Sequence, residues 1–162
     1  MQHATRHSSA IPIDAAYAQR LQCRRQWRGF LAALAQEFAQ ALPAQDLSLL
    51  MARVGTRFAV EHPLIASDTV DALQSAMNQV WDGMDWGLVE IVPSAGGMEV
   101  HHRFSPLAAA FGPTEADWAV GFLLGVYQQW FDAAGAGGMK VQAVAPLDSL
   151  GTAHLRLGAA AA

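Results

Sequence analysis

Apolar residues recur at helical spacing in four long stretches of the chain, at about 30–42, 46–61, 68–81 and 113–135. Pro43 ends the first stretch, and His62-Pro63 closes the second. Gly55 lies in the middle of the second stretch, where a glycine costs about 1 kcal/mol against Ala, so we expect a close contact there. The fourth stretch carries two neighbouring apolar stripes, although a surface helix needs only one. We therefore predict four helices, and we expect the last of them to be buried on more than one side.

Elsewhere apolar and polar residues alternate, as in half-buried strands. One pair of alternating segments covers 86–92 and 98–104 and is joined by a turn with two glycines, while a second pair covers 139–145 and 152–157. Strands grouped in hairpins, rather than alternating singly with helices, are typical of α+β folds. The pattern predicts three amino-terminal helices, an antiparallel four-stranded sheet from two hairpins, and a long helix between the hairpins.

The long helix offers two interpretations. Trp118, Phe122 and Trp130 lie on one stripe, and Gly121 and Gly125, four residues apart, leave a flat strip where another backbone can approach. We expect these five residues to form an interface between copies of the chain, with a Thr114 cap starting the helix. The alternative is a central core helix of a monomer, which is apolar all round because its own chain buries it all round.

The composition supports an oligomer and gives no support for a nucleic-acid-binding or membrane-spanning protein. Charged residues make up 15% of the chain, against about 25% in a typical soluble domain, which indicates hidden surface. The net charge of -4 gives no support for binding to nucleic acid or to an anionic membrane. No run reaches the 18 or so apolar residues of a membrane span, and Met1–Ala10 lacks the apolar core of a signal peptide. We expect a cytoplasmic protein.

The domain organisation follows from these patterns. Residues 1–22 are expected to be a flexible extension containing a short helix through Tyr17 and Leu21, 23–158 a single α+β domain, and 159–162 a frayed tail. His3 and His7 have the spacing of metal ligands on a helix, but nothing around them favours a helix. The lone Cys23 cannot form an internal disulfide. We expect neither a metal nor a cofactor.

Catalytic motifs are missing from the sequence. His101 and His102 are neighbours on a strand, so they point to opposite faces of the sheet. Glu90 and Glu99 lie on adjacent strands and could approach the separation of a glycosidase carboxylate pair. An exposed sheet face is the commoner explanation, so we expect no catalytic residue; turnover of a soluble cellodextrin would indicate the hydrolase alternative.

A basic cluster precedes the first long helix. Arg24, Arg25 and Arg28 surround Trp27, with Arg20 one turn earlier. The cluster is either a solvated face or a polar docking surface with one aromatic platform.

Several stretches resemble the bacterial cellulose synthase D-subunit family: Leu-Leu-Met-Ala-Arg-Val-Gly-Thr-Arg (49–57), Thr-Val-Asp-Ala-Leu-Gln-Ser-Ala-Met-Asn (69–78), Asp-Trp-Gly-Leu-Val-Glu (85–90) and Leu-Leu-Gly-Val-Tyr-Gln-Gln-Trp (123–130). Their order and spacing also fit, from about Trp27 to the end of the chain. The first twenty or so residues look like an extension beyond the family's usual start. The motifs are packing positions, so the likeness rests on the series rather than on any one of them.

The resemblance implies a non-enzymatic accessory subunit of the cellulose secretion machinery. Family members look like ring-shaped octamers built from dimers, with amino-terminal segments facing passages proposed to carry glucan chains. Another view makes the ring an intracellular scaffold that aligns synthase complexes with a proline-rich partner. Without a visible signal peptide, we expect the scaffold, on the cytoplasmic side of the membrane through the synthase complex.

The same resemblance implies a role for the basic cluster. Tyr17, Arg24, Arg25, Trp27 and Arg28 would face the ring interior. Trp27 would stack on an apolar sugar face while the arginines donate hydrogen bonds to hydroxyls, or bind an acidic partner protein. The alternative is that Trp27 packs back on the first helix.

A second resemblance leads to a different class of protein. Residues 50–55 and 85–91 also resemble the vinyl-reductase-type sensor domains, which bind hydrophobic ligands. Those domains often carry a cysteine-rich metal site, which this chain with its single cysteine does not match. An apolar pocket among the three helices would favour this small-molecule-binding module, and a tightly filled core would count against it.

Overall fold

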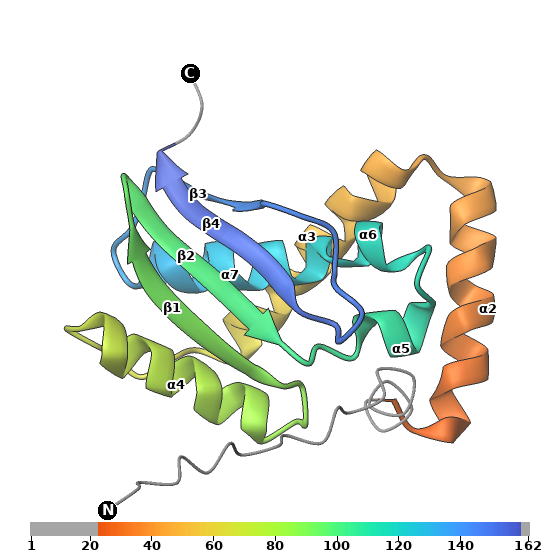
Figure 1. The fold of residues 1–162 in the computed structure, drawn as a ribbon, viewed down its shortest axis with the longest axis horizontal. Coiled ribbons are helices and arrows are strands. Elements are labelled where there is room, and N and C mark those ends of the chain that lie inside the picture. The colour runs from red at the N-terminus through yellow and green to blue at the C-terminus, as the bar shows by residue number, and fades with distance from the viewer. Residues whose placement is uncertain (1–22, 160–162) are drawn as a thin grey trace, which may run out of the picture.

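The computed structural model describes residues 23–159, which form three layers (Figure 1). A four-stranded sheet lies in front, the helix α7 (Gly121–Ala133) lies behind it, and α3 (Ala44–Glu61) crosses behind α7. The other elements are α2 (Arg25–Ala41), α4 (Val70–Asp82), β1 (Leu88–Ser94), β2 (Gly97–Arg103), α5 (Leu107–Phe111), α6 (Ala116–Ala119), β3 (Met139–Ala143) and β4 (Ala153–Ala159). The predicted α+β class, with its hairpins and the long helical segment between them, is confirmed.

The sheet is antiparallel throughout, in the order β1-β2-β4-β3. The pairing of β2 with β4 joins the two predicted hairpins, and it places His101 opposite His154. One face is buried against α7 and carries Val89, Ile91, Val100, His102, Val141, Leu155 and Leu157. The other face is polar and open. The alternation predicted for the first hairpin is therefore confirmed.

The long helical segment differs in detail from its prediction. It is divided at Val120 into α6 and α7, and α6 begins at Ala116 after a turn. The expected Thr114 cap is absent, because Glu115 and not Thr114 is the N-cap of α6. The Glu115 side chain makes no capping hydrogen bond and instead accepts from Trp118 Nε1 at 2.8 Å. The short helix α5, which the sequence patterns did not reveal, precedes this segment.

Helices α3 and α7 pack backbone against backbone because small residues face each other. A Cβ atom added to Gly125 would lie 1.9 Å from the carbonyl oxygen of Ala52, and one added to Gly121 would lie 2.3 Å from that of Ser48. From the other side, Gly55 would meet the Phe122 carbonyl at 2.0 Å. The close contact expected from a glycine in the middle of the second helix is thus present, and its partner is α7.

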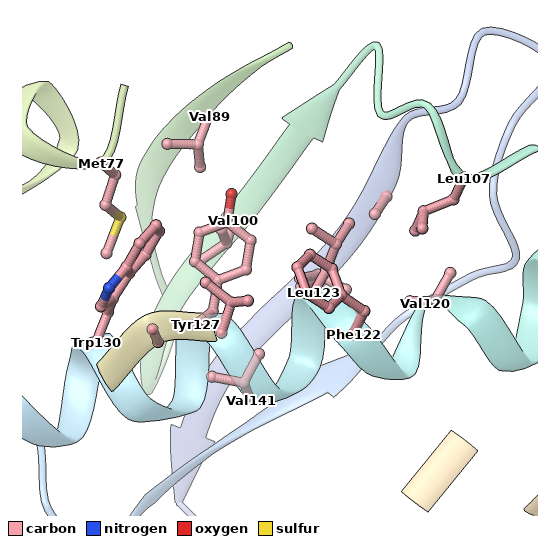
Figure 2. Packing of buried hydrophobic residues seen from close by; sticks show 14 of the residues in the cluster. Met77, Val89, Val100, Leu107, Val120, Phe122, Leu123, Tyr127, Trp130 and Val141 are labelled. Carbon is pink, nitrogen blue, oxygen red and sulfur yellow. The ribbon is translucent and has the colours of Figure 1, made fainter. Parts of the chain in front are cut away.

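Side chains of α7 and of the sheet fill the space between these two layers (Figure 2). Leu123, Val126, Tyr127 and Phe131 are at most 1% exposed, and Trp81 from α4 closes the core against Trp130 at a ring separation of 5.2 Å. Burial of this kind contributes about 1.5–3 kcal/mol for each large side chain. The core is therefore filled by side chains of one chain.

Both edges of the sheet are covered by amide side chains. On β1, Val89 donates to Asn78 Oδ1 at 2.7 Å and its carbonyl accepts from Asn78 Nδ2 at 2.9 Å, while Ile91 donates to Gln74 Oε1 at 2.6 Å. On β3, Val141 donates to Gln128 Oε1 at 3.0 Å. These outward backbone groups, which an edge strand normally presents to solvent, have partners within the chain.

Candidate functional site

The basic start of α2 forms the first surface of interest, which we call the basic patch: Arg24, Arg25, Trp27, Arg28 and Phe30. The rings of Trp27 and Phe30 are 53% and 58% exposed and meet edge to face at 6.2 Å. Arg24 and Arg25 are exposed, and Arg28 Nη2 donates to the carbonyl of Cys23 at 2.9 Å. Trp27 does not pack back into the core, so the patch presents an aromatic surface rimmed by positive charge.

This charge is not placed to stabilise α2. A helix amino terminus carries partial positive charge, and cations there cost stability instead of adding it. The first turn of α2 contains no acidic residue, and its N-cap, Arg24, makes no capping hydrogen bond through its side chain. The arginine charges at this end of α2 therefore oppose the helix dipole.

Helix α2 is loosely held by its own chain. Ala35 is its one fully buried residue, and α2 packs mainly against the short α5 at one end of the molecule (Figure 1). Leu31, Leu34 and Phe38 are only half-buried. Leu49 and Val54, on the neighbouring α3, are also exposed. Much of the apolar surface of α2 and of the outer side of α3 is thus left uncovered.

A second surface is a groove between α4 and the adjoining ends of β1 and β2, which we call the acidic groove. Its volume is about 770 Å³. It is lined by Ser75, Asn78, Gln79, Asp82, Asp85, Gly87, Leu88 and Phe104. Leu88 and Phe104 are 43% and 39% exposed. The groove combines two carboxylates with an apolar floor, and no Lys or Arg lines it.

The backbone around this groove is strained. Asp85 and Phe104, with φ of 56° and 60°, are the non-glycine residues with positive φ in the described part of the chain, and both line the groove. Between them, Gly87 has φ of 90°, and a Cβ atom there would lie 2.0 Å from the carbonyl oxygen of Arg103. For a residue with a side chain, as at Asp85 and Phe104, a positive φ costs about 1–3 kcal/mol and persists only where surrounding contacts hold it.

A buried polar chain holds the strained segment in place. His102 Nε2 lies 2.7 Å from the carbonyl oxygen of Trp86, which can only accept, so Nε2 carries the proton. The Tyr127 hydroxyl therefore donates to Nδ1, at 2.6 Å. Burial lowers the pKa of His102 to about 4 and raises that of Tyr127, so both groups are neutral near pH 7. Because Trp86 adjoins Asp85 and Gly87, the chain links α7 to the groove wall.

Opposite charges are separated along the sequence and in space. Between residues 58 and 102 the chain has no Lys or Arg, and its acidic residues there are Glu61, Asp68, Asp71, Asp82, Asp85, Glu90 and Glu99. The segment 23–57 has an excess of positive charge, with two acidic residues, Glu37 and Asp46, against Arg24, Arg25, Arg28, Arg53 and Arg57. Helices α2 and α4 stand on different sides of the molecule (Figure 1). The motif search missed the acidic groove; this separation of charge is the sequence signal that could have indicated it.

The residues predicted to form an oligomer interface lie in the core. Trp118, Gly121, Phe122, Gly125 and Trp130 are all buried within a single chain, and Trp130 Nε1 donates to the carbonyl of His62 at 3.0 Å. The apolar excess of this helix is accounted for by α3 on one side and the sheet on the other. A contact between copies must therefore use other side chains.

The remaining candidate residues are spread over the surface. Glu90 pairs with Arg103, and Glu99 lies 3.4 Å from His101, on the open face of the sheet. Among residues 23–159, no group of three or more His, Cys, Asp or Glu side chains could hold a metal ion. Tyr17, His3 and His7 lie outside the described residues.

An apolar groove of about 270 Å³ lies beside the end of α3, where Val60, Leu64 and Ile65 face Leu73 and the end of α7. It sits at the surface and not in the core, which is filled. Among the helices of residues 23–159, none has both the length and the apolar character needed to cross a bilayer.

Comparison with known families agrees with the motifs. The family model that describes the D subunit of cellulose synthase matches residues 13–158, which include every helix and almost every strand residue described above. A search of curated proteins finds no match. The matched range covers the basic patch, the acidic groove and the core that separates them. The chain belongs to the cellulose synthase D-subunit family.

Proposed function

We propose that the chain is a non-enzymatic accessory subunit of bacterial cellulose synthesis, acting as an oligomeric scaffold that aids ordered secretion and crystallisation of glucan chains. Family membership supports a role in cellulose biosynthesis together with the synthase complex. The observation that carries the scaffold is the basic patch on α2, where two adjacent aromatic rings are each more than half exposed.

Exposed aromatic and arginine side chains are typical of protein interfaces. Aromatic residues and Arg are enriched at the centres of such interfaces and dominate their energetics. Trp27 and Phe30 would be poorly placed on a monomer, because burying the exposed half of each would recover an apolar contribution of about 1 kcal/mol. Covering them with a partner is therefore the favoured state of this surface.

The sheet edges favour assembly through helices. The outward backbone groups of β1 and β3 are hydrogen-bonded to the side chains of Asn78, Gln74 and Gln128. A strand added at either edge would have to displace these side chains. The resemblance seen in the sequence extends this proposal to a ring of eight at the cytoplasmic side of the membrane, aligned with a proline-rich partner. If the patch instead faced the ring interior, Trp27 would stack on a glucan chain or the arginines would bind an acidic partner, and the oligomer would survive the loss of Trp27.

Light scattering at micromolar concentration tests the proposal. We expect the wild-type chain to form a defined oligomer, and the Trp27→Ala/Phe30→Ala double variant to lose it while keeping its circular dichroism spectrum. Val144→Ala is the matched control, because Val144 is 64% exposed but lies far along the chain from α2. A monodisperse wild-type monomer would overturn the scaffold.

The cellular readout follows from the same variants. Cells carrying the double variant should still make cellulose, since no catalytic group is removed, but the fibrils should lose order. Fibre diffraction of the secreted material measures this. Normal fibril order from an assembly-deficient variant would separate oligomerisation from function and contradict the proposal.

A further inference from the structure

We propose that the basic patch of one copy docks into the acidic groove of the next, so that the chains associate head to tail. This inference rests on the proposed scaffold function and adds the partner surface that the scaffold uses. It follows from three properties of the two surfaces: their charges, their apolar residues and their positions on the molecule.

The charges are complementary and exposed. Arg24 and Arg25 are exposed on the patch, and Asp82 and Asp85 are exposed in the groove. Opposite charges that meet across an interface steer association and fix its register. The groove lining contains no cation that would compete for the carboxylates. Contacts between two patches, or between two grooves, would instead bring like charges together.

The apolar residues match in the same way. Trp27 and Phe30 project from the patch, while Leu88 and Phe104 form the apolar part of the groove. The groove volume of about 770 Å³ lies within the range of about 300–1,000 Å³ typical of pockets that take up a ligand. Docking would bury large side chains that residues 23–159 of a single copy leave partly exposed on both surfaces.

The groove is held ready for a partner. Its wall is fixed through Trp86, whose carbonyl accepts from the buried His102, which in turn accepts from Tyr127. A rigid site loses less conformational entropy on binding than a mobile one. The strain at Asp85 and Phe104 is thus maintained by the core, before any partner arrives.

The geometry of the contact determines the kind of assembly. Because the patch and the groove are different surfaces of one chain, their contact is heterologous, and each copy has one of each to offer. Such contacts produce closed rings when the rotation per copy closes, and open filaments when it does not. Head-to-tail docking therefore provides a route to the ring in the proposed function.

Charge reversal tests the contact by mixing two variants. The first, Arg24→Glu/Arg25→Glu, is acidic on both surfaces; the second, Asp82→Arg/Asp85→Arg, is basic on both. We expect neither variant to assemble by itself at concentrations where the wild-type chain does. The dissociation constant of the contact between copies should rise at least tenfold, which corresponds to about 1.4 kcal/mol. Mixed in equal amounts, each patch meets a groove of opposite charge, and we expect assemblies of wild-type size containing both variants in equal number.

Sedimentation velocity with one variant labelled measures both outcomes. Circular dichroism tests whether each variant folds. If the Asp82→Arg/Asp85→Arg variant does not fold, the neutral Asp82→Asn/Asp85→Asn variant replaces it in the experiment. That variant should weaken assembly and flatten its dependence on salt between about 50 and 500 mM NaCl, because fewer charges remain to be screened. Wild-type assemblies from either reversed variant, or no rescue on mixing, would overturn the contact while leaving the scaffold intact.

Two other occupants of the groove would each give a different experimental result. If the chain's own residues 1–22 filled it, the groove variant would assemble normally and deleting those residues would shift the amide resonance of Asp85. If a glucan filled it, cellohexaose would shift the fluorescence or the amide resonances of the groove in a monomeric patch variant. Either result would overturn head-to-tail docking. A wild-type monomer would instead contradict the proposed function itself.

Discussion

Helices α7 and α2 are both rich in apolar residues, but they differ in how far the rest of the fold buries them. Helix α7 lies between α3 and the sheet, and its large side chains are almost fully buried. Helix α2 has one buried residue and carries two exposed rings. The difference shows that apolar content alone does not identify an interface. A helix whose apolar surface exceeds what its own neighbours cover is the better indicator, and here that helix is α2.

The largest effect is expected where α7 meets α3. Gly125→Leu would force a side chain into the backbone of Ala52, where even a Cβ atom would lie 1.9 Å from the carbonyl oxygen. We expect a loss of about 4 kcal/mol or more in the free energy of unfolding, the range of the most damaging substitutions. Urea denaturation measures it.

Gly137→Ala provides the control for this prediction. No atom lies within 4 Å of a Cβ atom added there, so the free energy of unfolding should change by less than about 0.5 kcal/mol. A folded, fully stable Gly125→Leu variant would show that the two helices can separate, and would reopen an interface role for α7.

Two tryptophans compare the helices directly. Trp130→Ala removes a ring that is 2% exposed and a hydrogen bond to His62, and we expect a cost of about 3–5 kcal/mol. Trp27→Ala removes a side chain that is 53% exposed. The free energy of unfolding, measured at dilutions where the chain is monomeric, should therefore change by less than about 1 kcal/mol. Equal losses at the two positions would mean that α2 belongs to the core.

The pH dependence of stability reports on His102. Its pKa is lowered from 6.5 to about 4 in the folded chain. Between these values the unfolded chain binds a proton that the folded chain does not, so stability is greatest above pH 6.5 and falls as the pH approaches 4. The shift corresponds to about 3 kcal/mol.

Denaturation of the wild-type chain and of His102→Gln from about pH 7 to pH 4 separates this contribution from that of the acidic residues. The variant should be less stable at neutral pH and should lose less on acidification. Parallel curves would mean that His102 takes up a proton as readily in the folded chain as in the unfolded chain, and would remove the polar chain as the support of the groove wall.

The regular elements could be predicted from the sequence because their signals are local. Alternation indicated the strands near 86–104, and Gly55 indicated a close helix contact. The division of the long helix at Val120 and the five-residue α5 had no comparable signal, since a short helix contains too few turns to show a period.

The site was harder to predict for a physical reason. An all-round apolar pattern shows that α7 is buried but not by which chain, so the interface was sought on Phe122 and Trp130. The basic patch was recognised because its residues are consecutive. The acidic groove joins Gln79, Asp85 and Phe104 from three elements, and only the fold brings these residues together.

The amide side chains at the sheet edges have a consequence for solubility. The segment Leu88–Val92 has the high β-propensity and low charge of strands that template amyloid, and it lies at an edge. Asn78 and Gln74 hold the backbone groups that such templating would need. Resistance to fibre formation therefore depends on α4 staying docked, and a lesion that frees α4 would leave an edge strand open to aggregation.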